Sequence, residues 1–188
     1  MKKLNRLKHL GAYLSGPIDF ANDKGHGWRD EITPFLEDMG VEVFNPLKHK
    51  YFGCEDFDSH KRPKMKDMAT KGQFKELRDQ MKDVNHWDLR SVDLSSFLVV
   101  NYDNSVHMAG TYEEIFKANN QCKPVLLVLS CRKSEISSWV LGRFPDEHMF
   151  ESWEQLKKYL ISINSNKDHD FTEADNKRWL FFSGDHIF

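Results

Sequence analysis

The sequence predicts an α/β fold: a doubly wound, mostly parallel five-stranded sheet with helices on both faces, flavodoxin-like or Rossmann-like, in a single domain over residues 1–188. Residues 96–101 (SFLVVN) and 124–129 (PVLLVL) are continuous apolar runs rather than alternating ones. Such runs are typical of strands that helices cover on both faces. Strand-like and helix-like segments also alternate along the chain, which indicates parallel strands joined by crossover helices.

The first part of the chain supplies two further strands and a helix. Residues 12–15 (AYLS) form a short apolar run that stops at a Gly-Pro pair, and residues 41–44 (VEVF) form another that stops at Asn-Pro. Between them, residues 28–39 place apolar side chains three or four positions apart, which is the spacing of a helix with one buried face. These segments predict a strand–helix–strand unit.

The rest of the chain continues the alternation around one insert. Residues 48–72 are polar and without a clear period, so we expect an insert or lid there. Residues 73–87 and 151–163 have helical apolar spacing, and a further helix is expected after Gly110. Residues 165–188 form a polar spacer followed by an aromatic carboxyl-terminal tail.

Composition narrows the possible partners. The 188 residues carry 27 basic and 29 acidic side chains, a balance that argues against a nucleic acid polymer as partner. No apolar run of signal-peptide or membrane length follows the basic amino end, so neither export nor membrane binding is expected. The cysteines lack a CxxC pair and are too few for a disulfide framework, which favours a reducing cytoplasm and disfavours a structural zinc. We expect no cofactor and no metal.

Carboxylates gather where a parallel sheet places its ligands, beyond the carboxyl ends of the strands. The loop after the first strand, SGPIDF, has neither the GxGxxG spacing of dinucleotide sites nor a P-loop. Paired carboxylates suit chemistry at the anomeric carbon of a sugar, and from the residues alone they would also suit magnesium. The carboxylates are Asp19, Asp88, Asp103, Glu113 and Glu114.

The two adjacent glutamates have a structural alternative. Thr111 and Glu114 have the T-x-x-E spacing of a capping box, in which Glu114 would accept from the backbone of Thr111. Both Glu113 and Glu114 would also be favoured near the positive end of the helix dipole. The local pattern alone therefore leaves the role of either glutamate open.

Three blocks occur in a distinctive order: YLSGPIDF, HWDLRSVDLSSFLVVNY and AGTYEEIFKANNQCKPVLLV. The first ends a strand in a glycine-containing loop, the second places Asp-Leu before a buried strand, and the third opens a helix with G-T-x-x-E before a valine-rich strand. Together they cover about half the chain and resemble the nucleoside 2-deoxyribosyltransferase family, which shares its fold with the 2′-deoxynucleoside 5′-monophosphate N-glycosidases.

The resemblance implies three catalytic residues. The family nucleophile lies four positions after the loop glycine and eleven before the next valine, and counts from Gly110 and from Val125 both lead to Glu114. Such a glutamate attacks the deoxyribose C1′ and forms a covalent glycosyl-enzyme. Asp88 matches the aspartate that moves a proton on or off the base, and Tyr13 matches a tyrosine that orients the nucleophile. From the residues alone, Asp88 could instead be the N-cap of a short helix, DLRSVD, and Tyr13 a half-buried strand aromatic.

The resemblance also implies substrate contacts, for which structural alternatives exist. Gly16 could simply form a turn, and the end of the tail could simply pack on the core. Asp103 is the nearest match to a second family aspartate, although it is displaced from the family position. The implied substrate-binding residues are Gly16, Pro17, Asp19, Asp103, Gly110 and Phe188.

The resemblance implies an enzyme that exchanges the nucleobase of 2′-deoxynucleosides, with small-molecule nucleosides and nucleobases as partners and a homo-oligomeric assembly. Two alternatives keep the fold: a hydrolase of deoxynucleoside 5′-monophosphates, and a nucleoside-binding module without turnover. Because a glutamate folded back on Thr111 cannot attack a sugar, we expect the Glu114 carboxylate to face the pocket, no capping box, and a solvated Glu113.

Overall fold

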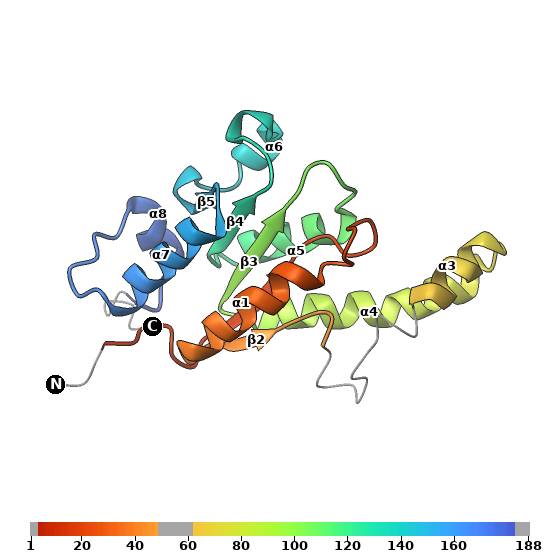
Figure 1. The fold of residues 1–188 in the computed structure, drawn as a ribbon, viewed down its shortest axis with the longest axis horizontal. Coiled ribbons are helices and arrows are strands. Elements are labelled where there is room, and N and C mark those ends of the chain that lie inside the picture. Colours follow the sequence, from red (N-terminus) through yellow and green to blue (C-terminus); the bar gives the residue numbers. More distant parts are fainter. Residues whose placement is uncertain (1–3, 49–61, 183–188) are drawn as a thin grey trace.

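The computed structural model describes residues 4–48 and 62–182, in which a parallel sheet lies between two layers of helices (Figure 1). The strands follow the order β2-β1-β3-β4-β5, and every neighbouring pair is parallel. The predicted doubly wound fold is thereby confirmed. In sheets of this order, ligands bind where the winding reverses, next to β1 and β3. The strands are β1 (Gly11–Ser15), β2 (Glu42–Phe44), β3 (Phe97–Tyr102), β4 (Val125–Leu129) and β5 (Met149–Phe150).

The helices cover both faces of the sheet. On one face, α1 and α7 pack on a cluster that includes Leu14 and Leu126. On the other face, α4 and α5 pack on a cluster that includes Tyr13, Leu98 and Leu127. Successive side chains of β1 thus point to opposite faces of the sheet and pack against opposite helical layers, as the two-residue period of a strand requires. The described helices are α1 (His26–Asp38), α3 (Arg62–Thr70), α4 (Phe74–Leu94), α5 (Ala109–Asn120), α6 (Ser138–Leu141), α7 (Trp153–Ser165) and α8 (Glu173–Arg178), with short 3₁₀ turns η2 (Lys133–Glu135) and η3 (Asp146–His148).

The structure is more regular than the sequence predicted, because α6, β5 and α8 lie in segments for which no helix or strand was expected. Helix α4 runs without a break from Phe74 to Leu94, so Asp88 lies in its interior and cannot be the N-cap of a separate helix. Part of the expected insert or lid is also regular: α3 occupies residues 62–70 and lies at the amino end of α4, beyond the sheet (Figure 1). The remainder of that segment, residues 49–61, lies outside the described residues. Among those that are described, no helix combines the length and apolarity needed to span a bilayer.

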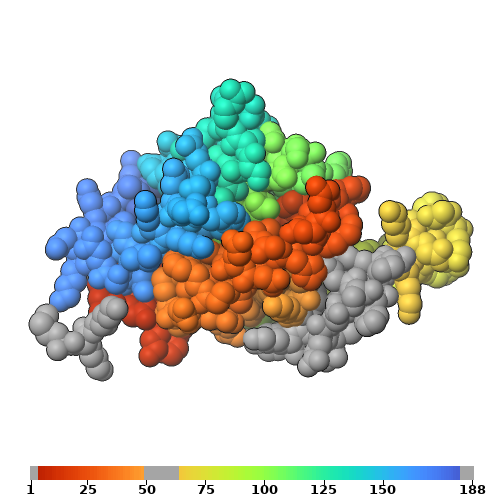
Figure 2. Space-filling view, in the orientation of Figure 1, coloured from red at the N-terminus to blue at the C-terminus, as the bar shows by residue number. Residues whose placement is uncertain are grey.

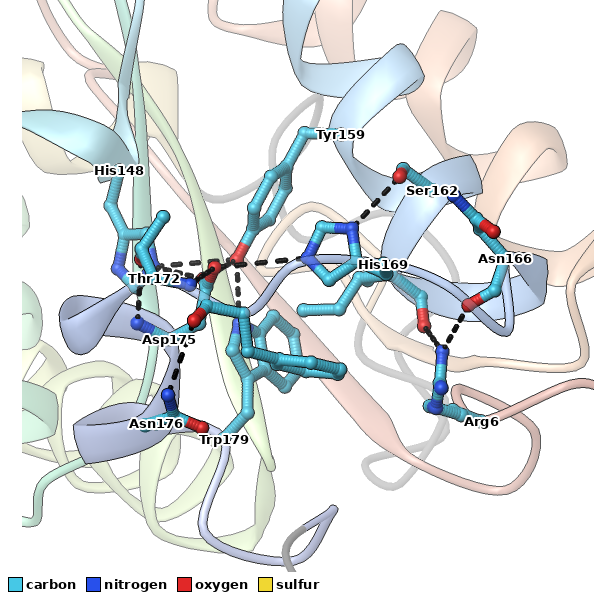
Figure 3. A network of polar contacts seen from close by, with 12 residues as sticks. Arg6, His148, Tyr159, Ser162, Asn166, His169, Thr172, Asp175, Asn176 and Trp179 are labelled. Carbon is cyan, nitrogen blue, oxygen red and sulfur yellow. Dashed lines mark hydrogen bonds and ion pairs between the residues drawn. The ribbon is translucent and has the colours of Figure 1, made fainter.

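The carboxyl-terminal segment is tied to the core by a buried polar network (Figure 3). The Tyr159 hydroxyl on α7 donates to Asp175 Oδ1 on α8 (2.5 Å) and accepts from Trp179 Nε1 (2.7 Å). His148 Nε2, just before β5, lies 3.0 Å from the same carboxylate oxygen. Trp179 is almost fully buried against Phe97 of β3. These contacts hold α8 against the sheet, whereas Phe188 lies outside the described residues.

Candidate active site

Strand β1 directs two hydroxyl groups at one carboxylate of helix α5. The Tyr13 hydroxyl donates to Glu114 Oε1 over 2.8 Å, and the Ser15 hydroxyl donates to Glu114 Oε2. Tyr13 and Ser15 are two residues apart, so their side chains leave β1 on the same face. Both oxygens of the Glu114 carboxylate are therefore held from the carboxyl end of the first strand.

The Glu114 side chain turns to the sheet rather than to its own helix. Helix α5 begins at Ala109, so Thr111 lies inside the first turn, and the N-cap Met108 makes no side-chain capping bond. The capping box is not formed, as the sequence analysis predicted. Glu113 is exposed, as predicted, whereas Glu114 is only 9% exposed.

The surroundings of Glu114 shift the pKa of its carboxyl group toward neutral pH. Burial raises the pKa of Glu114 to about 7, although hydrogen bonds from Ser15 and Tyr13 and the positive charge of Arg29 oppose the shift. A carboxyl group with such a pKa is mostly charged in mildly alkaline solution and mostly neutral in acid. It can therefore act as a nucleophile or exchange protons near neutral pH.

The third implied catalytic residue, Asp88, lies in the same neighbourhood. Helix α4, which carries it, packs against β1. Burial, together with the negative charges of Glu114 and Asp88, raises the pKa of Tyr13 well above its usual value. Tyr13, which is 1% exposed rather than half-buried, consequently stays protonated and serves as a hydrogen-bond donor. The structure thus brings Tyr13, Asp88 and Glu114 together from three elements.

Arg29 supports this site and was not predicted from the sequence. Its fully buried guanidinium donates to the carbonyl oxygens of Leu14 (3.3 Å), Gly16 (2.9 Å) and Gly25 (2.8 Å). It thereby ties the end of β1 to the beginning of α1. A signal for it existed, because Arg29 shares with Ile32 and Leu36 the spacing of a buried helical face.

The loop after β1 contributes tight packing and an exposed rim. A Cβ atom on Gly16 would lie 3.0 Å from the Trp28 ring and 3.2 Å from the Asn101 carbonyl oxygen, so close approach requires glycine there. Pro17 is buried and Asp19 is exposed. Gly16 therefore has a packing role at this position, and its expected contact with the substrate stays a prediction.

Two other residues expected to contact the substrate are Asp103, in the loop after β3, and Gly110, in the first turn of α5. Asp103 Oδ1 accepts from the backbone N–H of Ser105 (3.0 Å) and from its hydroxyl (2.6 Å), which makes a local turn. Asp103 is therefore engaged in its own loop, whereas the Glu114 carboxylate is held by β1. Gly110 is exposed, and a Cβ atom there would meet nothing within 4 Å among the described residues.

The loops after β1 and β3 lie side by side at this edge of the sheet (Figure 2). The ring of Phe20, which is 63% exposed, lies 5.9 Å from the ring of His107 in an edge-to-face arrangement. In residues 4–48 and 62–182, no group of three or more His, Cys, Asp or Glu side chains is placed to hold a metal ion. This edge of the sheet thus combines a carboxyl group with a pKa of about 7, hydroxyl donors to that group and an exposed aromatic ring.

Comparisons with known proteins bear on the fold. Neither a protein-family model nor a curated protein sequence matches the chain. Among solved structures, a 2-deoxyribosyltransferase from Bacillus psychrosaccharolyticus aligns with a TM-score of 0.53 and 20% identity, over 79% of this chain and 91% of that chain. A 2-deoxyribosyltransferase from Leishmania mexicana aligns with a TM-score of 0.51 and 13% identity, over 81% and 97%. The chain has the fold of the 2-deoxyribosyltransferases, as its sequence resemblance predicted.

Proposed function

We propose that this protein is a nucleoside 2-deoxyribosyltransferase, which exchanges the nucleobase of 2′-deoxynucleosides through a covalent deoxyribosyl ester on Glu114. The observation that carries the proposal is the Glu114 carboxylate itself: buried at the ligand-binding edge of the sheet, held by hydroxyl groups of β1, and of near-neutral pKa. The shared fold of two solved 2-deoxyribosyltransferases supports it.

In the first half-reaction, an electron pair of the Glu114 carboxylate forms a bond to the deoxyribose C1′. The C1′–N bond breaks, its electron pair stays on the departing base, and Asp88 in its acid form supplies a proton to that base. Tyr13 keeps the carboxylate oriented through the 2.8 Å hydrogen bond to Oε1. The product is a glycosyl ester of Glu114 and a free nucleobase.

In the second half-reaction, a nitrogen of an incoming nucleobase attacks C1′. The C1′–O bond to Glu114 breaks, its electron pair returns to the carboxylate, and the proton lost by the base goes to Asp88. Water in place of the base would give hydrolysis, so exclusion of water decides between transfer and hydrolysis.

The rim of the site suits an aromatic base on an uncharged sugar. The exposed ring of Phe20, next to His107, offers a face on which a nucleobase can stack. The exposed Asp19 in the same loop would repel a 5′-phosphate, which favours nucleosides over nucleotides as substrates. We also expect a homo-oligomer, which sedimentation of the purified protein would test.

A product assay tests the proposal. The protein is incubated with 2′-deoxyinosine, thymidine or deoxynucleoside 5′-monophosphates, each with and without adenine, and the products are separated by chromatography. Appearance of 2′-deoxyadenosine only when adenine is present supports the transferase. Release of free base from a monophosphate regardless of adenine would instead identify a hydrolase, and binding without any product would identify a non-catalytic module.

A trapping experiment tests the intermediate. A 2′-deoxy-2′-fluoro nucleoside should leave a stable fluorodeoxyribosyl adduct, seen as a mass increase on the peptide that contains Glu114. The fluorine slows both steps by destabilising positive charge at C1′, and it slows breakdown of the ester enough for detection. An adduct on another residue, or full turnover by Glu114→Ala, would refute the mechanism.

A further inference from the structure

Ser15 carries a buried hydroxyl whose position is fixed by contacts of its side chain and of both neighbouring residues. The side chain is fully buried at the carboxyl end of β1 and donates to Glu114 Oε2. Arg29 holds the carbonyl groups of the residues on both sides of it, Leu14 and Gly16. The hydroxyl is therefore presented to Glu114 from an immobilised backbone, which is the arrangement that orients a reacting group accurately.

Packing alone does not account for a serine at this position. A buried hydroxyl loses its bonds to water, so burial is costly unless a partner inside the protein replaces them. At Ser15 the partner is the carboxylate of Glu114, and Tyr13 holds the other oxygen of the same group. Each oxygen thus has its own donor, and the plane of the carboxylate is defined by two contacts instead of one.

We propose that Ser15 is a positioning residue that holds the Glu114 carboxylate and assists the breaking of the glycosyl ester. The inference rests on the proposed function. In the ester, Glu114 is neutral, because an electron pair of its carboxylate forms the bond to C1′. When that bond breaks, the electron pair returns to Glu114, and a hydroxyl donor on its carboxylate stabilises the returning charge. In the forward direction the same donor stabilises the starting carboxylate, so it favours breakdown of the ester over its formation.

Two measurements distinguish this role from a merely structural one. With 2′-deoxyinosine as donor and adenine as acceptor, Ser15→Ala should lower kcat about tenfold, as expected for loss of a hydrogen bond to a charged group. The share of protein that carries the deoxyribosyl ester, measured by intact mass after an acid quench, should rise. A simple loss of structure would lower turnover without raising that share.

The second measurement needs no substrate. In protein labelled with ¹³C-carboxyl glutamate, the Glu114 resonance is assigned by its absence in Glu114→Gln, and its titration is followed by NMR. Ser15→Ala should raise the pKa of Glu114 by about one unit, because a donor to the charged form has been removed. Ser15→Thr, which keeps the hydroxyl, should restore the wild-type titration and ester share.

Ser96→Ala is the matched control. The Ser96 hydroxyl accepts from the backbone N–H of Gly11 (3.2 Å) at the opposite end of β1. The substitution therefore removes a hydrogen bond of a serine hydroxyl far from Glu114. If Ser15→Ala leaves both the titration and the ester share unchanged while the wild type forms the ester, the role of Ser15 is refuted and the proposed function stands. If the wild type forms no ester and Glu114→Ala turns over normally, both are refuted.

Discussion

Tyr13 and Glu114 are 101 residues apart in the sequence and are joined by a 2.8 Å hydrogen bond from the phenol to Glu114 Oε1. The bond connects the first strand to helix α5 at the edge where parallel sheets bind ligands. Because burial keeps the phenol protonated, the direction of this bond is fixed: Tyr13 donates and Glu114 accepts. A glutamate that the local sequence would assign to helix capping is thereby turned toward the sheet.

Replacement of Glu114 should separate chemistry from folding. Glu114→Gln keeps an acceptor for Tyr13 but cannot form the glycosyl ester, so turnover should fall by roughly 10³-fold or more. Steady-state kinetics and circular dichroism would check the two properties on the same sample. Glu113→Gln, one residue earlier on the exposed face of α5, is the matched control and should keep near-normal turnover. Comparable losses in both variants would contradict the assignment.

The pH dependence of turnover should follow the charge of Glu114. In the proposed mechanism only the carboxylate form of Glu114 attacks, and its pKa is about 7, so kcat/KM should fall as the solution is acidified through neutrality. A profile that stays flat down to pH 5 would show that the reacting group has an ordinary carboxylic pKa or is not Glu114. The fall of kcat/KM on the acid side of the pH profile is measured with saturating acceptor, so that protonation of the acceptor does not contribute.

The same pKa predicts a stability effect. The folded pKa of Glu114 is raised from 4.5 to about 7, so the folded protein holds a proton in this interval that the unfolded chain releases. The stabilising contribution is full below pH 4.5 and is lost as the pH rises through 7, at about 1.4 kcal/mol per pH unit in between. Glu114→Gln should therefore gain stability relative to wild type between pH 5 and pH 8. Urea unfolding at both values tests this, and an unchanged difference would argue against the raised pKa.

The loss of kcat on replacing Asp88 should depend on whether the leaving base needs a proton. Asp88→Asn should lower kcat with 2′-deoxyinosine by about 10²-fold or more, since it would remove the proposed general acid. With 7-methyl-2′-deoxyguanosine, whose base is already cationic and departs neutral, the loss should be small. Equal losses on the two substrates would assign Asp88 to folding or binding rather than to proton transfer.

The sequence was sufficient for the fold because its signals were strong ones. The runs that became β3 and β4 are long and apolar, and a sheet covered on both faces requires that pattern. Strand β5 has only two residues, too few for any periodic signal. The extent of α4 was misjudged at Trp87, although Phe74–Leu94 contains neither glycine nor proline to end a helix.

The candidate site was only partly predictable. The family resemblance, through counts from Gly110 and Val125, led to Glu114, but the local pattern could not say whether its side chain faced the helix or the sheet. Ser15 was missed because a strand-end serine is common, and its significance depends on α5 crossing at that point. Arg29 was missed because its charge outweighed its place on the buried face of α1, and the carbonyl groups that bind it come from another segment. Contacts between distant segments are what a local pattern lacks.

The buried carboxylate of Asp175 should control attachment of the carboxyl-terminal segment. Its Oδ1 accepts from Tyr159 (2.5 Å) and lies 3.0 Å from His148 Nε2, and its Oδ2 accepts from the backbone N–H of Thr172 (3.1 Å). Burial would raise the pKa of Asp175, but these hydrogen bonds outweigh it and hold the pKa well below the usual range. Asp175→Asn places an amide NH₂ toward groups that are themselves donors, and should cost about 2–4 kcal/mol of stability at pH 7.

The loss should depend on pH in a defined direction. Because the folded pKa of Asp175 is depressed, its contribution is present above the unfolded pKa, near 4, and is lost as the pH falls toward the folded value. The difference in unfolding free energy between wild type and Asp175→Asn should thus shrink between pH 7 and pH 3. The exposed Asp168→Asn serves as the control and should change stability little at either pH. If the difference for Asp175→Asn stayed constant over this range, the carboxylate would not be the group that fixes α8 to the core.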